Sequence, residues 1–369
     1  MSIKFFFFIT VLLCACAIKA QPFAYILAGT YDSGSSKGIF IYKFNYKTGE
    51  ATKASNNTDI SNASYITTDE KTNTVYAVSE HTNAKAKVFA FAFNRITGIL
   101  TKKMEAQAGG DHPCYIAISP KDNIIATANY SSGSASIFKI NSGLDTNIAA
   151  QIIQHKGKSI NATRQAAPHV HTTNFDAYGN CWVADLGTDS IHVYAWKNNA
   201  MLQIAAIKMA AGSGPRHIAF SKKLRHAYSV NELDATVSLV DYTDINNLQL
   251  KQIQSLVDSV VSEDEGAADI HISPDGTFLY ASIRGRSNQI AVLSVEKDGW
   301  LTRIKNTNTM GQKPRNFFID KTGKYLFIAN ENSNTIMIFT INKKTGIPAY
   351  TGKHISLPKP VCIKMMYGF

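Results

Sequence analysis

A segment of about fifty residues recurs six times along this chain, and a seventh copy is divided between the two ends. Each copy starts at a turn, runs through a short apolar strand, turns at an Asp/Lys/Gly cluster and returns through a second strand that ends near Asn. The copies align at six anchor residues: Ala63, Pro113, Pro168, Pro215, Ala267 and Pro314. By subtraction of their numbers, the anchors lie 50, 55, 47, 52 and 47 residues apart, the period of a four-stranded β-propeller blade.

The divided copy indicates how the ring closes. Pro360 begins a strand, PVCIKM, that has no second strand after it, and residues 24–30 (AYILAGT) form a second strand with no first strand before it. Pairing the two completes a blade and removes an exposed sheet edge. The sequence therefore predicts an all-β fold, a seven-bladed β-propeller closed by its N- and C-terminal strands in one blade.

The repeat also sets the domain organisation. A chain of 369 residues is long enough for two domains, but the repeat runs through nearly all of it. The strands are short and rich in β-branched and aromatic residues, and no stretch keeps a helical period. We expect a single propeller domain over residues 21–369.

The first twenty residues lie outside the repeat. Lys4 precedes an apolar run over residues 5–17, and the small residue Ala20 precedes Gln21. This pattern predicts a signal peptide over residues 1–20, because the run is too short to span a bilayer. The protein is expected to be exported to the periplasm or outside the cell; the alternative is a lipoprotein anchored at Cys16. No other segment is predicted to span a membrane.

Cysteine usage and charge narrow the possible ligands. Beyond the leader only Cys114, Cys181 and Cys362 remain, each inside a predicted strand and without metal-ligand or haem spacing. We interpret them as small core residues and expect neither a metal nor another cofactor. The net charge is +11, but no run of five or more basic residues exists, so we expect no nucleic-acid partner. A monomer that binds a small anionic ligand fits this composition better.

Propeller geometry predicts where a site lies. The start of a blade's first strand and the end of its second open on the same face of the ring. The residues that follow the anchors include His169, His171, Arg216, His217, Asp269 and Arg315. Their predicted neighbours, about sixteen positions later, include Glu80, Asn129, Asp185, Asn231, Glu232, Arg284 and Glu331. A site lined by His, Arg and Glu follows at one end of the central axis.

The histidine pair has several possible roles. His169 and His171 are two residues apart, so on a regular strand they face the same side. They can serve as general base, hydrogen-bond donor or metal ligands, or they can be buried structural residues. No third ligand at a suitable spacing accompanies them, which disfavours a metal site.

The charged residues also allow two interpretations each. Arg216 and Arg315 follow prolines at equivalent positions, where an arginine can contact a ligand or tie adjacent blades together. Glu232 and Arg284 stand at strand ends where most copies carry neutral residues, which indicates either function or an ion pair between blades. His217, which follows Arg216, and Asn231, which precedes Glu232, are further candidates for substrate binding. The Asp-Leu-Gly-Thr-Asp segment 185–189 is predicted to build a turn with aspartates capping backbone amides.

Taken in order, several segments resemble one family. They are GTYDSGSSKGIFIY, HPCYIAIS, ANYSSGS, APHVH, DLGTDSIHVY, GSGPRHIAF, NEL, ISPDGTFLYAS, KPRNFFID and LFIANENSNTI. Over residues 24–364 the chain resembles the seven-bladed lactonases, which include propeller-type 6-phosphogluconolactonases and fungal carboxy-muconate cyclases. The resemblance implies an active site of His169 or His171 with Arg216, Glu232 and Arg284. Ser282-Ile283-Arg284 stands where relatives commonly have Ser-Asn-Arg.

This resemblance implies a lactonase that opens a sugar-acid lactone. Glu232 or His171 would deprotonate the attacking water, and Arg216 with Arg284 would bind the substrate anion and stabilise the oxyanion. Independently of the resemblance, the predicted positions of His217, Asn231 and Arg315 on the same face of the ring make them candidates for substrate binding. Two alternatives remain open: a cycloisomerase of the carboxy-muconate type, and a propeller that binds a ligand without turning it over.

Overall fold

The computed structural model describes residues 23–34, 36–140, 149–258 and 266–368. The predicted signal peptide and the alternative lipid-anchored Cys16 lie outside the described residues. Within the described part, no helix is long and apolar enough to cross a membrane, and the helical structure consists of two short 3-10 turns, η1 (Asn83–Lys85) and η2 (Leu186–Thr188).

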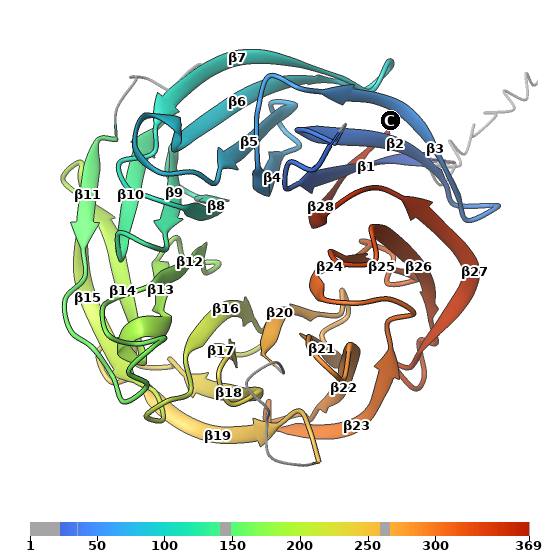
Figure 1. Cartoon of the computed structure of the whole chain (residues 1–369). Helices are drawn as coiled ribbons and strands as arrows, with labels where there is room; N and C mark the ends of the chain where they lie inside the picture. Colours follow the sequence, from blue (N-terminus) through green and yellow to red (C-terminus); the bar gives the residue numbers. More distant parts are fainter. Residues whose placement is uncertain (1–22, 35, 141–148, 259–265, 369) are drawn as a thin grey trace, which may run out of the picture.

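Seven four-stranded antiparallel sheets surround a central axis (Figure 1). The closing blade has the order β28 (Pro360–Tyr367), β1 (Phe23–Thr30), β2 (Ile39–Asn45), β3 (Glu50–Asn57). The next three, from the innermost strand outward, are β4 (Ala63–Asp69), β5 (Thr74–Ser79), β6 (Lys87–Asn94), β7 (Ile99–Gln107); β8 (Pro113–Ile118), β9 (Ile124–Asn129), β10 (Ser134–Lys139), β11 (Gln151–Gln154); and β12 (Val170–Phe175), β13 (Cys181–Asp185), β14 (Ser190–Lys197), β15 (Ala200–Lys208). The last three are β16 (Pro215–Phe220), β17 (His226–Asn231), β18 (Thr236–Asp241), β19 (Gln249–Ser255); β20 (Ala267–Ile272), β21 (Phe278–Ile283), β22 (Gln289–Val295), β23 (Leu301–Asn308); and β24 (Pro314–Ile319), β25 (Tyr325–Asn330), β26 (Thr335–Ile341), β27 (Pro348–Ser356).

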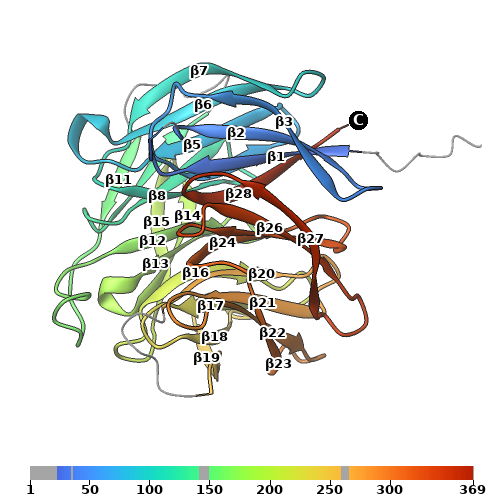
Figure 2. The same cartoon turned by 45° about the vertical axis from the view of Figure 1, so that its right-hand side comes forward.

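The predicted closure of the ring is confirmed. β28 pairs with β1 in antiparallel register, with Tyr25 opposite Met366 and Leu27 opposite Lys364. Figure 2 shows the two strands side by side in an oblique view of the ring. Because the two ends of the chain share one sheet, this strand pair holds the first and last parts of the chain together.

The burial pattern follows from this arrangement. The second strand of a blade has neighbouring blades on both faces, so β9 and β13 are buried along their whole length. The outermost strands, such as β7, are exposed at most positions and are polar. Cys114, Cys181 and Cys362 are all buried free thiols, as expected of small core residues.

One irregularity recurs at the mouth of the ring. Each innermost strand pairs with its neighbour through a register shift within its first residues, as between Pro215 and His217 in β16 and between Pro314 and Asn316 in β24. Such a bulge breaks the strict alternation of side chains. Two consecutive residues of one strand, such as Arg216 and His217, can therefore both reach the region around the axis.

Candidate active site

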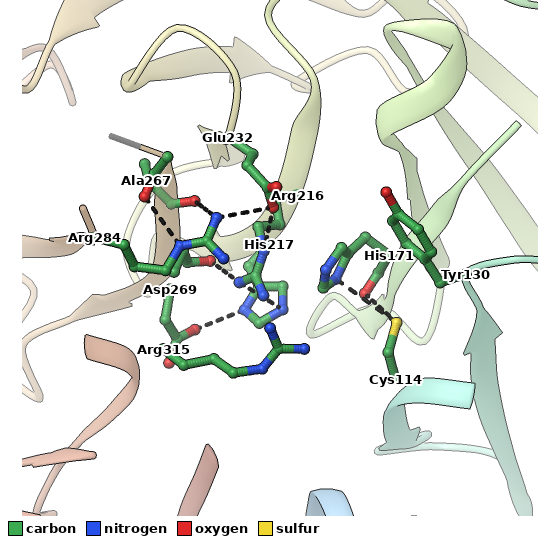
Figure 3. A network of polar contacts seen from close by, with 12 residues as sticks. Cys114, Tyr130, His171, Arg216, His217, Glu232, Ala267, Asp269, Arg284 and Arg315 are labelled. Carbon is green, nitrogen blue, oxygen red and sulfur yellow. Dashed lines mark hydrogen bonds and ion pairs between the residues drawn. The ribbon is translucent and has the colours of Figure 1, made fainter. Parts of the chain in front are cut away.

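A buried carboxylate is the centre of the site. Glu232 follows β17 and is 5% exposed. Its Oε2 lies 2.8 Å from Nε of Arg216 and 3.2 Å from Nη2 of Arg284 (Figure 3), and its Oε1 lies 2.6 Å from Nη2 of Arg164. The Nε–H of Arg216 does not point along its contact, which is therefore an ion pair rather than a linear hydrogen bond.

The three arginines decide the ionisation of Glu232. Burial alone would raise the pKa of this carboxyl group, but Arg284 and Arg216, with smaller effects from His171 and Arg164, hold it well below its usual range. Both of its oxygens are already engaged by guanidinium groups. The geometry therefore favours Glu232 as the group that orients the arginines, and leaves proton transfer to another residue.

Arg216 and Arg284 are held differently. Arg216 is 1% exposed, and its Nη1 donates to the Ala268 carbonyl and lies 3.4 Å from Nε2 of His217. Burial lowers the pKa of Arg216 to about 10, so it stays charged at neutral pH. Arg284 donates to the carbonyls of Gly266 and Ala267 at 3.1 and 3.2 Å. Both guanidinium groups are thus fixed by backbone as well as by Glu232.

His171 lies beside Arg216 in the same site. Its ring is 5% exposed and lies 5.3 Å from that of His217 and 5.4 Å from that of Tyr130, centroid to centroid. Its Nδ1 is 3.7 Å from Sγ of Cys114, while Nε2 makes no hydrogen bond to any described residue. Burial, reinforced by Arg216, lowers the pKa of His171 well below its usual value. The ring is therefore neutral at pH 7 and can accept a proton.

His169 lies at the rim of the site. Its ring stacks on Tyr130 at 4.5 Å, its Nδ1 lies 3.1 Å from the Tyr130 carbonyl, and its backbone N–H donates to Asp185. These contacts fix the start of the strand that carries His171. Of the two histidines, the geometry favours His171 for chemistry.

A second group of contacts, here called the belt, surrounds the axis. It includes residues that come one position after Arg216 and Arg315 on their inner strands. His217 Nδ1 lies 2.7 Å from Asp269 Oδ1, and Asn316 Nδ2 donates to the other oxygen of Asp269. The ring of His217 also contacts that of Tyr115, which stacks on Tyr65. This belt, drawn from five blades, supports the arginine layer above it.

Arg315 lies on β24, directly before Asn316. Figure 3 shows its side chain extending toward His217. Its guanidinium is 5.3 Å from the ring centroid of Tyr31 and 4.0 Å from Glu80, which also accepts a hydrogen bond from Tyr31. Its charge is therefore partly compensated by Glu80, and the residue can both connect blades and face a ligand.

Asn231 does not join this group. It is fully buried, and its amide donates to Thr236 and Ser238 at 2.8 and 2.9 Å. Asn129 makes the same pair of hydroxyl contacts in another blade. The side chain thus holds the hairpin between the second and third strands, so the structure does not support the substrate contact expected for Asn231.

Sequence reasoning missed Arg164 and Tyr130. Arg164 lies in a loop that is longer than the corresponding connections 108–112 and 209–214, and the alignment of blades therefore passes over it. The available signal was the anchor spacing of 55 residues between Pro113 and Pro168, the longest of the series. No group of three or more His, Cys, Asp or Glu residues within the described ranges is arranged to hold a metal ion.

His217 should make the stability of the protein depend on pH. Burial and Arg216 lower its pKa from 6.5 to about 4, despite the bond to Asp269. Between these values the unfolded chain binds more protons than the folded one, so the free energy of unfolding falls as the pH is lowered from 6.5 to 4. We expect His217→Gln to reduce this slope by up to about 1.4 kcal/mol per pH unit in urea titrations. An unchanged slope would show that His217 is not held neutral.

The matching family model is described as "Lactonase, 7-bladed beta-propeller" and covers residues 25–365. The chain is 29% identical over 343 residues to a 6-phosphogluconolactonase of Bacillus subtilis (strain 168), covering 92% of this chain and 97% of the relative. It is 33% identical over 324 residues to a 6-phosphogluconolactonase of Formosa agariphila, covering 85% and 91%. The chain belongs to the seven-bladed β-propeller lactonase family.

Solved structures agree with this assignment. A periplasmic gluconolactonase of Pseudomonas aeruginosa superposes with a TM-score of 0.88 at 26% identity, covering 94% of this chain and all (100%) of the other. A Bacteroides fragilis protein provisionally described as a 6-phosphogluconolactonase superposes with a TM-score of 0.87 at 36% identity, covering 94% and 98%. The family and the fold expected from the sequence are thus both confirmed.

Proposed function

We propose that this protein is a carboxylic-ester hydrolase that opens a sugar-acid lactone to the free acid. The observation that carries the proposal is the convergence of Arg216 and Arg284 on Glu232 beside the neutral imidazole of His171. This arrangement offers fixed positive charge and a proton acceptor within one site. Both accelerate lactone hydrolysis.

The arginines act on the carbonyl oxygen. Charge builds on this oxygen when water attacks, and preorganised donors stabilise it most when they need not reorient. Nη2 of Arg216 and Nη1 of Arg284 make no hydrogen bonds to the described residues, so they are available to the substrate. Glu232 keeps both groups in place.

His171 handles the proton. Its Nε2 takes a proton from the attacking water as the water oxygen bonds to the carbonyl carbon. When the bond from that carbon to the ring oxygen breaks, the imidazolium returns the proton to the leaving alkoxide. A positioned acid–base of this kind contributes about 10²–10⁴-fold. No net proton is consumed in the step itself.

A panel of aldonolactones tests the proposal. We expect acid release above the spontaneous background, and a fall of about 10²-fold or more in kcat for His171→Gln. His226→Gln, at the opposite end of the strand that leads to Glu232, is the matched control and should keep full activity. Full turnover by His171→Gln would remove His171 from the mechanism.

Isotope labelling separates the alternatives. In heavy-oxygen water a hydrolase incorporates the label into its product, whereas a cycloisomerase does not. Tight binding of lactones in calorimetry without any turnover would support a propeller that only binds its ligand. Either result would overturn hydrolysis.

We also propose that the protein acts after export. The leader-like residues 1–20 support this, and so does the likeness to a gluconolactonase described as periplasmic. The mass of the mature protein from fractionated cells decides the matter: a chain beginning at Gln21 supports export. A lipidated chain beginning at Cys16 supports the lipoprotein, and an unprocessed cytoplasmic chain excludes both.

A further inference from the structure

The long loop 155–169 brings an additional arginine to the site. It connects the outermost strand β11 of one blade to the innermost strand β12 of the next, and it is longer than the corresponding connections 108–112 and 209–214. Arg164 lies within this loop, and its guanidinium reaches Oε1 of Glu232 at 2.6 Å. Glu232 belongs to yet another blade, so the loop extends over the start of β12.

Two buried aspartates hold the loop. Asp189 accepts hydrogen bonds from Ser159 Oγ at 2.5 Å and from Gln165 Nε2 at 2.8 Å. Asp185 lies 2.9 Å from Nδ1 of His155 at the start of the loop, and its other oxygen caps Gly187 as the sequence predicts. A fully satisfied buried network of this kind fixes one conformation. The Asp-Leu-Gly-Thr-Asp segment therefore also positions the loop.

Arg164 differs from the other two arginines in its access to solvent. Its side chain is 41% exposed, compared with 1% for Arg216 and 14% for Arg284. Its Nη2 donates hydrogen bonds to Glu232 and, at 3.4 Å, to the hydroxyl of Tyr130. Its Nε and Nη1 make no hydrogen bonds to the described residues. Arg164 can therefore bind a ligand without releasing Glu232.

The site has more positive than negative charge, which favours the binding of an anion. Three guanidinium groups share the single carboxylate of Glu232, and His171 nearby is neutral. Arg216 and Arg284 contact one carboxylate oxygen and Arg164 contacts the other. Arg164 thus approaches the Glu232 carboxylate at a different oxygen from the inner pair, so a ligand whose lactone carbonyl meets that pair can reach Arg164 with another part of the molecule.

We infer that Arg164 binds an anionic group at the end of the substrate distal to the lactone carbonyl, either a phosphate or a carboxylate. The inference rests on the proposed function and narrows its substrate class to acidic aldonolactones. A guanidinium suits both anions, because its planar fork of donors matches their oxygens.

Kinetics on matched lactones test the inference. The wild type, Arg164→Gln and Lys158→Gln are assayed on gluconolactone, 6-phosphogluconolactone and a glucarolactone. For the acidic lactone that is the substrate type, we expect Arg164→Gln to raise KM by about 10- to 100-fold with kcat within a few-fold. The KM for gluconolactone should rise by a clearly smaller factor, because that lactone has no anionic group for Arg164 to bind. Lys158→Gln removes an exposed charge from the same loop and should change nothing. The response of the phosphate and carboxylate lactones identifies which anion is bound.

Equilibrium binding keeps the two proposals separable. Calorimetry compares 6-phosphogluconate, glucarate and gluconate on the same three proteins. We expect Arg164→Gln to lose the preference for one of the diacids over gluconate. Equal losses of affinity for gluconate and for the two diacids, or no loss at all, would overturn the inference. A wild type that binds these acids but hydrolyses none of the lactones would instead overturn the proposed function, and the binding data would still decide the role of Arg164.

Discussion

Replacing Arg216 with glutamine is expected to lower kcat/KM for lactone hydrolysis by about 10²–10³-fold. Arg216 is buried, stays charged at neutral pH and is held by Glu232 and the Ala268 carbonyl. Its donors are therefore already oriented when charge develops on the substrate oxygen, so most of the loss should fall on kcat. Steady-state kinetics on the best aldonolactone measure the effect.

Two controls make this result interpretable. Arg225→Gln removes an arginine from the opposite end of the same blade, where Arg225 stacks on Tyr178, and should leave kcat/KM unchanged. Arg216→Lys keeps the charge but not the planar fork, and should recover only part of the activity. A folded Arg216→Gln protein with kcat/KM within threefold of the wild type would exclude Arg216 from catalysis.

Glu232→Gln is expected to lower the free energy of unfolding by about 3 kcal/mol or more, because it leaves three guanidinium groups without their counter-charge in a largely buried site. Urea unfolding at neutral pH measures the loss. Activity should fall as well, since Arg216 and Arg284 lose their common anchor.

The repeat itself provides a matched control for this change. Glu331 follows Asn330 as Glu232 follows Asn231, and it is similarly buried, but it pairs with the half-exposed Lys313 at 3.1 Å. We expect Glu331→Gln to cost about 1 kcal/mol or less. Equal destabilisation by the two variants would mean that the arginine cluster gives Glu232 no special structural role.

The blade period made most of the fold predictable from sequence. Six of the seven inner strands begin at the predicted anchor residues, because each anchor marks a turn whose chemistry is local. The exception is β12, which begins at Val170 rather than at Pro168, after the loop that approaches from β11. Three Asn-x-x-Thr-Gly segments, which begin at Asn45, Asn94 and Asn342, form the turns between third and fourth strands, with a φ of 71° at Gly49, Gly98 and Gly346. Glycine is suited to such a turn because it adopts a positive φ without strain.

The site was predictable only where it follows the repeat. His171, Arg216, Glu232 and Arg284 converge because equivalent positions in successive blades face the same end of the axis. A regular strand would send Arg216 and His217 to opposite sides, and only the bulge brings both to the site.

Side-chain contacts that the repeat does not determine account for the rest. The sequence does not show that the side chain of Asn231 donates a hydrogen bond to Thr236, because a buried amide can find hydrogen-bond partners on either side of its strand. Arg164 escapes the alignment for a different reason. Its position depends on Asp185 and Asp189, which belong to another connection of the chain.

A crystal structure with the aldonic acid product bound tests the central claim most directly. We expect the product carboxylate to lie within hydrogen-bonding distance of Arg216 and Arg284, with His171 Nε2 facing its carbon atom. A product bound elsewhere on the propeller, with these three side chains untouched, would contradict the account.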